Sequence, residues 1–232
     1  METIALTPLE REALWLSVKV SSWAVAGSLP LGIACAWLLA RRHFPGRMLL
    51  DGLIHMPLVL PPVVTGYVLL VMFGRRGVLG ERLADWFGIQ VAFTWKAAAI
   101  ASAVMAFPLM VRAIRLSLET VDQGLEDAAR SLGASPPRVF ATITLPLIAP
   151  GILTGVILAF ARSLSEFGAT ITFASNIPGE TRTLPLALYT LTQVPGGDAP
   201  AIRLCVIAAL LAMGALLASE ILSRRIQRRL SG

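Results

Sequence analysis

Residues 126–146 read EDAARSLGASPPRVFATITLP, a polar stretch of small residues directly ahead of a long apolar segment. Helix-forming residues precede Gly133, and Asp122 or a neighbour can cap the start of their helix. Gly133 stands where a helix ends in a left-handed cap. Ser135 can then cap a second short helix, with Pro136 at its first position. The stretch therefore predicts two short helices that meet in an elbow.

This elbow carries residues that suit contact with another protein. Ala128 and Ala129 would let a second backbone approach closely. Four charged residues can fix the register of such a contact: Glu126, Asp127, Arg130 and Arg138. An ordinary solvated helical loop would have the same spacing, so docking and plain exposure both stay open on this pattern alone.

The composition of the chain is that of a membrane protein. Of its 232 residues, 56% are hydrophobic, and the mean hydropathy is +0.73. A soluble domain does not need so much apolar surface, so residues 1–232 are predicted to form one integral membrane domain in contact with lipid. The net charge of +6 comes from arginines beside apolar segments, which favours a cytoplasmic membrane face over nucleic acid as the partner.

Five stretches are long and apolar enough for a spanning helix of about 20 residues. They are residues 16–40, 48–73, 97–118, 146–171 and 201–222. The expected fold is an all-α membrane protein with five transmembrane helices, in which the elbow belongs to a loop at residues 119–145.

The distribution of basic residues predicts the orientation in the membrane. If the C-terminal tail is cytoplasmic, five spans put the N-terminus outside. Eleven arginines then lie inside: Arg41, Arg42, Arg47, Arg112, Arg115, Arg130, Arg138, Arg224, Arg225, Arg228 and Arg229. Seven basic residues lie outside: Arg11, Arg75, Arg76, Arg82, Lys96, Arg182 and Arg203. This excess favours an orientation of the multi-pass chain with loop 119–145 on the cytoplasmic side of the membrane.

Motifs for catalysis or metal binding are absent from the sequence. It has no Gly-rich loop followed by Lys, no HExxH, no CxxC and no GxSxG. Cys35 and Cys205 lie inside apolar spans and are expected to be small buried hydrophobes. The chain is therefore predicted to be non-enzymatic, with neither a metal nor a cofactor.

Two charged residues of the fourth span are candidates for a gate. Arg162 and Glu166 are four residues apart, hence on one helix face, and lie in the outer half of the expected span. A charge in hydrocarbon should face protein or water. The pair is expected to join within the chain or across a dimer near an outer gate; an interfacial pair that reaches up to water is the alternative.

The second span contains candidates for residues that would line a path across the membrane. PLVLPPVVTG at 57–66 contains Pro61 and Pro62, which kink a helix, and Thr65, which offers a hydroxyl. Interrupted backbone at membrane depth is tolerated where it lines a cavity, so this span is expected to line the path unless the kink serves packing alone. Further candidates stand on the fourth span: Gly168, Thr170 and Thr172.

The elbow resembles the EAA loop of ABC importer permeases. The matching residues, at the family's spacing, are Ala128, Ala129, Gly133, Ile143, Leu145 and Pro146. Asp127 stands where the family has Glu, with Glu126 one residue earlier, so the carboxylate that makes the family's ATPase contact stays open. The resemblance implies a type I importer architecture whose short coupling helices dock on a separate ATPase subunit.

Nearly the whole chain, from about residue 12 to 222, resembles the molybdate ABC transporter permeases. The runs that carry this resemblance are FPGRMLLDGLIHMPLVLPPVVTGYVLL, GRRGVLGERLADWFGI and FARSLSEFGATITFASNIPGETRTLPLALYTL. The resemblance implies a homodimer, two cytoplasmic ATPase subunits, a periplasmic molybdate-binding protein, and transport of molybdate or tungstate by alternating access. Sulfate permeases share the plan and remain an alternative. An ion-coupled carrier would be expected to have internal repeats or midmembrane carboxylates, which we do not find.

Overall fold

The computed structural model describes residues 6–230, with the side chains at 216, 219, 220 and 222–230 left outside the description. Four arginines behind the predicted orientation fall among those side chains: Arg224, Arg225, Arg228 and Arg229. The cytoplasmic placement of the C-terminal tail therefore remains a prediction.

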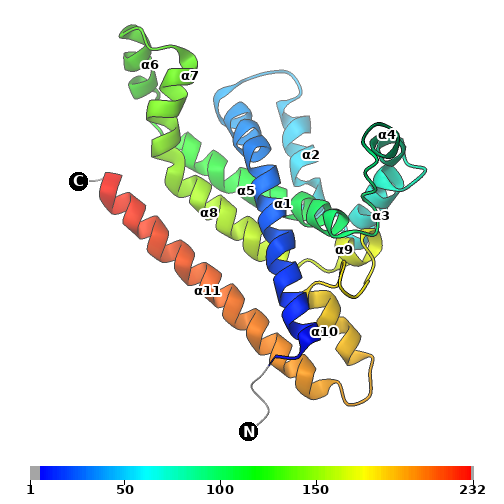
Figure 1. The fold of residues 1–232 in the computed structure, drawn as a ribbon. Helices are drawn as coiled ribbons and strands as arrows, with labels where there is room; N and C mark the ends of the chain where they lie inside the picture. Colours follow the sequence, from blue (N-terminus) through cyan, green and yellow to red (C-terminus); the bar gives the residue numbers. More distant parts are fainter. Residues whose placement is uncertain (1–5, 231–232) are drawn as a thin grey trace.

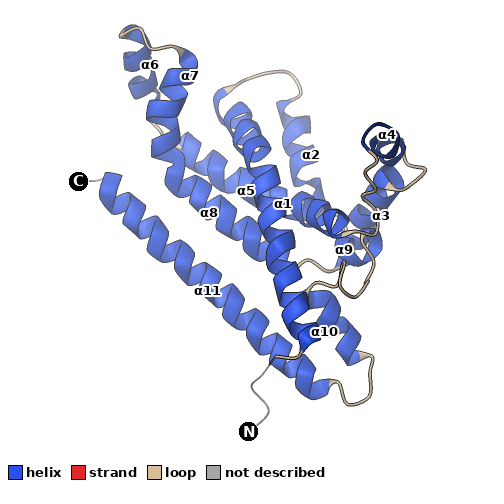
Figure 2. Cartoon of the chain, in the orientation of Figure 1, coloured by secondary structure: helices blue, strands red, loops and turns tan. Residues whose placement is uncertain are grey.

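Within residues 6–230 the chain consists of helices and connecting loops, with no strand (Figure 2). In chain order the elements are α1 (Pro8–Arg41), α2 (Arg47–Val59), α3 (Pro62–Phe73), α4 (Val78–Phe87), α5 (Trp95–Glu119), α6 (Gln123–Ser131), α7 (Pro136–Val139), the π-helix η1 (Phe140–Thr144), α8 (Leu145–Leu164), α9 (Gly168–Phe173), α10 (Leu184–Thr192) and α11 (Asp198–Leu230).

The core of the molecule lies around α5, which packs between α1 and α8 (Figure 1). Its buried side chains include several alanines, Met110 and Ile114. On α8, a Cβ atom at Gly155 would come within 3.1 Å of the Met110 carbonyl oxygen. Small residues at such contacts let two helix backbones approach closely, which is how apolar helices pack well in a membrane.

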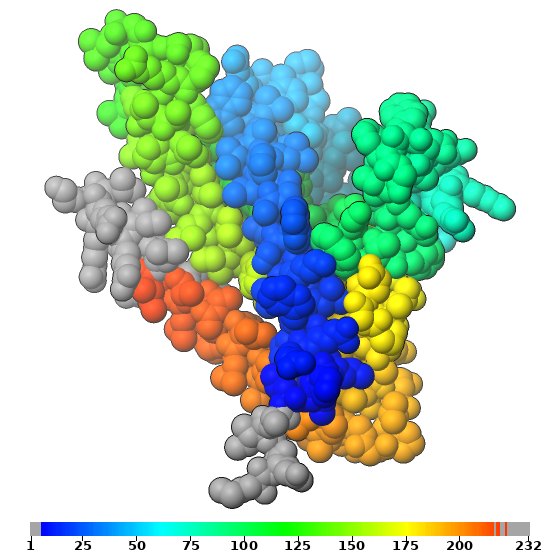
Figure 3. Space-filling model, viewed as in Figure 1, coloured from blue at the N-terminus to red at the C-terminus, as the bar shows by residue number. Residues whose placement is uncertain are grey.

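Four helical segments are long and apolar enough to cross a membrane: α1, α5, the continuous run Pro136–Leu164, and α11. The pair α2 and α3 makes a fifth crossing if it is counted as one bent span. The prediction of an all-α fold with five transmembrane segments is thus confirmed. The elbow made by α6 and α7 projects from one end of the bundle, while α1 runs down its face (Figure 3).

The second expected span, residues 48–73, is interrupted at the predicted proline pair, and the interruption is a full break of the helix rather than a kink. The chain leaves the helix at Leu60 and Pro61, and the direction of the helix bends by 114° between α2 and α3. The cause is the double proline. Each proline restricts the residue before it to extended backbone, and Leu60 and Pro61 have ψ angles of 142° and 132°.

The fourth expected span, residues 146–171, also differs. Its helix begins upstream at Pro136, passes through η1 and ends at Leu164, and α9 follows as a separate short helix. The break at residues 165–167 is stabilised locally, because the Glu166 carboxylate accepts a hydrogen bond of 2.9 Å from the backbone N–H of Ala169. Side chains that bond nearby backbone in this way compete with a continuous helix.

Candidate functional site

The elbow forms for the local reasons that its sequence indicates. The Asp122 carboxylate accepts a 2.8 Å hydrogen bond from the N–H of Gly124 and caps α6. Gly133 follows the helix with φ of 87°, a conformation that favours glycine. Pro136 opens α7, but the Ser135 side chain before it makes no capping hydrogen bond. All but the Ser135 cap agrees with the predicted geometry.

The two neighbouring carboxylates of α6 differ in exposure, although both pair with Arg130. The Asp127 side chain is 69% exposed and pairs with Arg130 at 2.6 Å, whereas the Glu126 side chain is only 7% exposed. Asp127 is therefore open to contact by another protein, whereas most of the Glu126 side chain is covered by this chain.

Glu126 joins three helical elements through its two oxygens. Its Oε1 accepts a hydrogen bond of 2.8 Å from the Thr144 hydroxyl of η1 and lies 3.1 Å from Nη2 of Arg41 on α1. Its Oε2 lies 3.2 Å from Nη2 of Arg130 on α6. Arg41 and Thr144 were not among the predicted site residues, since no short motif links them to the elbow.

Two leucines of the elbow have no cover within the described part of the chain. Leu125 is 51% exposed and Leu132 is 89% exposed. Together with Ala128, also exposed, they follow the i, i+3, i+7 spacing of one helix face. The sequence carried this signal, but the prediction considered only the small and charged residues.

The remaining predicted residues of the elbow lie in its second half, after Gly133. Arg138 and Pro146 are exposed, and Ile143 and Leu145 are half-buried. They lie along α7, η1 and the first residues of α8, so the elbow passes without a break into a membrane-spanning helix.

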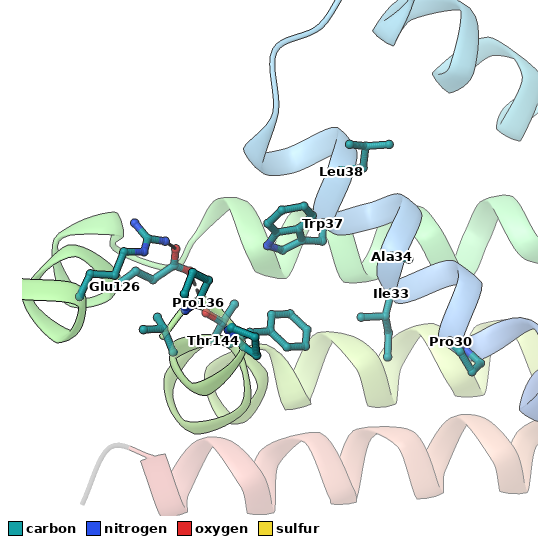
Figure 4. Close-up of a pocket in the computed structure, with 12 residues that line it drawn as sticks. Pro30, Ile33, Ala34, Trp37, Leu38, Glu126, Pro136 and Thr144 are labelled. Carbon is teal, nitrogen blue, oxygen red and sulfur yellow. Dashed lines mark hydrogen bonds and ion pairs between the residues drawn. The ribbon is translucent and has the colours of Figure 1, made fainter. Parts of the chain in front are cut away.

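A cavity of about 670 Å³ separates the elbow from α1 (Figure 4). Its walls are mostly apolar, with Ile33 and Trp37 of α1 on one side and Pro137 and Phe140 of the elbow on the other. Glu126, Arg130 and Thr144 form its polar end.

Arg162 and Glu166 form the ion pair that their spacing predicts, with Nη1 of Arg162 lying 2.7 Å from Oε2 of Glu166. The Glu166 side chain is 1% exposed and the Arg162 side chain is 25% exposed, so the carboxylate is buried while the guanidinium keeps some access to the surface. Both carboxylate oxygens are used, since Oε1 also accepts the hydrogen bond from Ala169.

The two interrupted segments lie against each other, where α3 packs on α9. A Cβ at Gly168 would come within 2.8 Å of the Pro62 Cβ. The hydroxyls of Thr65 and Thr170 are buried with no hydrogen-bond partner within the described residues, whereas the Thr172 hydroxyl donates to the Gly168 carbonyl. The structure thus brings together the predicted path residues of the second and fourth spans, including the break at Pro61.

Sequence relatives agree with this architecture. The chain is 66% identical over 219 residues to "Molybdenum transport system permease protein ModB" of Escherichia coli K12, covering 94% of this chain and 96% of that protein. It is 39% identical over 202 residues to "Sulfate transport system permease protein CysT" of the same organism, covering 87% and 72%.

A solved structure shares the fold at low sequence identity. A chain of a bacterial ABC transporter involved in alginate import superposes with a TM-score of 0.74 at 18% identity, covering 95% of this chain and 81% of that one. The sequence profile described as "Binding-protein-dependent transport system inner membrane component" matches residues 28–231. The chain therefore belongs to the family of binding-protein-dependent transport system inner membrane components.

Proposed function

We propose that this chain is the membrane-spanning subunit of an ATP-driven importer that carries molybdate, and its analogue tungstate, into the cell by alternating access. The observation that carries the choice of molybdate is the 66% identity, over almost the full length of both chains, to a molybdenum transport permease. The chain itself is a non-catalytic subunit, and ATP hydrolysis belongs to a partner.

The exposed elbow supports an ATPase partner. Leu125 and Leu132 present an apolar face to solvent, and the Asp127 carboxylate of the same helix is exposed. Burial of exposed leucines is a main driving force of association. Docking there would place the elbow end of the bundle in the cytoplasm and the N-terminus outside. A periplasmic molybdate-binding protein would deliver the anion to the opposite end.

A homodimer would form the path. The described chain contains one set of interrupted segments, α2–α3 and α8–α9, and two copies would enclose a route between them. Arg162 and Glu166 would belong to the outer gate, and Pro61, Pro62, Thr65, Gly168 and Thr170 would line the route. Interrupted backbone at membrane depth is tolerated where it is buried in protein or lines a cavity.

Uptake by proteoliposomes tests the proposal. The chain is reconstituted with its ATPase subunits and binding protein, and radioactive molybdate is supplied outside. Uptake should need ATP inside, both partners and an intact elbow. Uptake by the purified chain alone under an ion gradient would indicate a secondary carrier and overturn the proposal.

Sulfate is the second candidate cargo, because the chain also has substantial identity to a sulfate transport permease over most of its length. Competition separates the two. An excess of unlabelled tungstate should suppress molybdate uptake, while the same excess of sulfate should leave most of it. The reverse order would assign the chain to sulfate.

A further inference from the structure

α1 is held at each end by an ion pair of a carboxylate and a guanidinium, and the carboxylate of each pair is buried. At its last residue, Arg41 meets Glu126 of α6 at 3.1 Å, with exposed side-chain fractions of 9% and 7%. At its first turn, the buried Glu10 meets Arg203 of α11 at 2.7 Å. Between the pairs, α1 continues as one helix through Pro30 and spans about 50 Å at 1.5 Å per residue.

The Arg41–Glu126 pair bridges a region in which α1 and the elbow are not closely packed. The cavity of about 670 Å³ lies between α1 and the elbow and is lined by Ile33 and Trp37 of α1 and by Phe140 of the elbow. Figure 4 shows the Ile33 and Trp37 side chains on α1. Arg41 reaches past the cavity to Glu126 and also donates to the Val121 carbonyl at 3.3 Å. Across the cavity, polar contacts therefore hold α1 to the elbow.

Glu126 of α6 contacts both η1 and α1, so a movement of the elbow would pass from this residue to two other helices. Thr144, bonded to the same carboxylate oxygen as Arg41, ends the π-helix that leads into α8. π-helical turns often mark functional sites. A displacement of α6 would reach α8 along the backbone, and the Glu126 carboxylate links it directly to α1, in addition to the packing of α1 on α5 and α8.

We propose that Glu126 is a positioning residue that transmits elbow movement to α1 through Arg41, and through α1 to the Glu10–Arg203 pair on α11. This inference rests on the proposed function, in which an ATPase subunit moves the elbow. It divides the two carboxylates of α6 by role: Asp127 faces the ATPase, and Glu126 faces inward and links the helices.

The test measures how far nucleotide-driven movement travels. In the assembled transporter, with Cys35 and Cys205 replaced by Ser, one spin label is placed either on the elbow at Ala141→Cys or on the outer half of α1 at Ser22→Cys; both sites are exposed. Distances between the two copies are recorded with and without ATP. The wild-type background should show an ATP-dependent change at both positions.

Glu126→Gln keeps the shape and an acceptor for Thr144 but removes the charge that holds Arg41. The change at the elbow should persist, the change on α1 should become clearly smaller, and molybdate transported per ATP hydrolysed should fall by about fivefold or more, the usual scale of a coupling effect. Arg41→Met should lower the amount of molybdate transported per ATP hydrolysed in the same way. Arg41→Lys keeps a positive charge and should retain more of this transport than Arg41→Met. Arg42→Met removes the exposed neighbouring guanidinium and its contact with the Trp37 ring but leaves the Arg41–Glu126 pair intact; it is the matched control and should resemble wild type.

Three results would overturn the inference. One is an α1 distance change of full size in both Glu126→Gln and Arg41→Met. Another is loss of ATPase subunits from Glu126→Gln during purification, to the extent seen for Asp127→Asn, which would make Glu126 a docking residue. The third is an equal defect in Arg42→Met. The distances require no cargo, so failure of the wild type to transport molybdate would count against the proposed function alone.

Discussion

Gly66 of α3 faces the backbone of Ala169 in α9 so closely that a Cβ on Gly66 would lie 2.6 Å from the Ala169 carbonyl oxygen and 2.8 Å from its Cα. This contact joins the two interrupted segments of the chain. Because the neighbouring atoms belong to the backbone, they have no flexible side chain that could move away.

Gly66→Ala should therefore destabilise the protein. Overpacking a close contact costs about 1–3 kcal/mol, and a thermal unfolding transition in detergent should fall by several degrees. Gly27→Ala is the matched control, because a Cβ at Gly27 meets nothing within 4 Å. An unchanged transition for Gly66→Ala would show that α3 and α9 are not packed as described.

Gly133 supports a second prediction, which concerns the elbow alone. Its φ of 87° favours glycine, and a side chain with a Cβ atom costs about 1–2 kcal/mol there. Gly133→Ala should weaken co-purification of the ATPase subunits while the bundle stays folded, as judged by thermal unfolding. Gly133→Asn should be milder, since Asn tolerates the left-handed region. Equal behaviour of the two variants would argue against strain as the cause.

The exposed leucine of the elbow gives a third prediction. Leu132 is 89% exposed, and burying a leucine side chain in an interface contributes about 1.5–3 kcal/mol. Leu132→Ala should weaken ATPase-subunit binding by about tenfold or more without changing the stability of the isolated chain. Leu210→Ala on α11, at a leucine that is 67% exposed, should bind normally. Wild-type affinity for Leu132→Ala would remove this residue from the docking surface.

The ion pair at the end of α8 gives a fourth prediction. Glu166→Gln removes the charge that meets Arg162 at 2.7 Å, and loss of one partner of a buried pair leaves the other uncompensated. If the pair belongs to the outer gate, molybdate uptake should fall while ATP hydrolysis continues. The amount of molybdate taken up per ATP hydrolysed therefore measures the contribution of the pair to the gate. Asp85→Asn, at an exposed carboxylate of α4, is the control. Unchanged uptake for Glu166→Gln would limit the pair to a structural role.

Local features of the fold were predictable from the sequence because neighbouring residues determine them. Asp122, Gly133 and Pro136 specify where the short helices of the elbow begin and end, and the apolar lengths specify the number of crossings. The double proline at 61–62 predicted an interruption. The bend of 114° between α2 and α3 could not be predicted from the sequence, because it depends on the packing of α3 against α9.

Contacts between distant residues were not predictable in the same way. Glu126 and Arg41 are 85 positions apart, and no helical period relates them. The sequence also left open which carboxylate of α6 faces outward, since Glu126 and Asp127 are adjacent. The packing of α1 and η1 around the elbow decides it, because only Glu126 has Arg41 and Thr144 within reach.

Site-specific crosslinking tests the central claim that the elbow receives an ATPase subunit from the cytoplasm. A benzophenone maleimide is attached at Leu132→Cys or, for comparison, at Leu210→Cys, in the assembled transporter lacking Cys35 and Cys205. Light should join the ATPase subunit to position 132 and not to position 210, and labelling of position 132 should require access from the cytoplasmic side. Capture of the binding protein at position 132, or labelling from the outer side, would contradict the account.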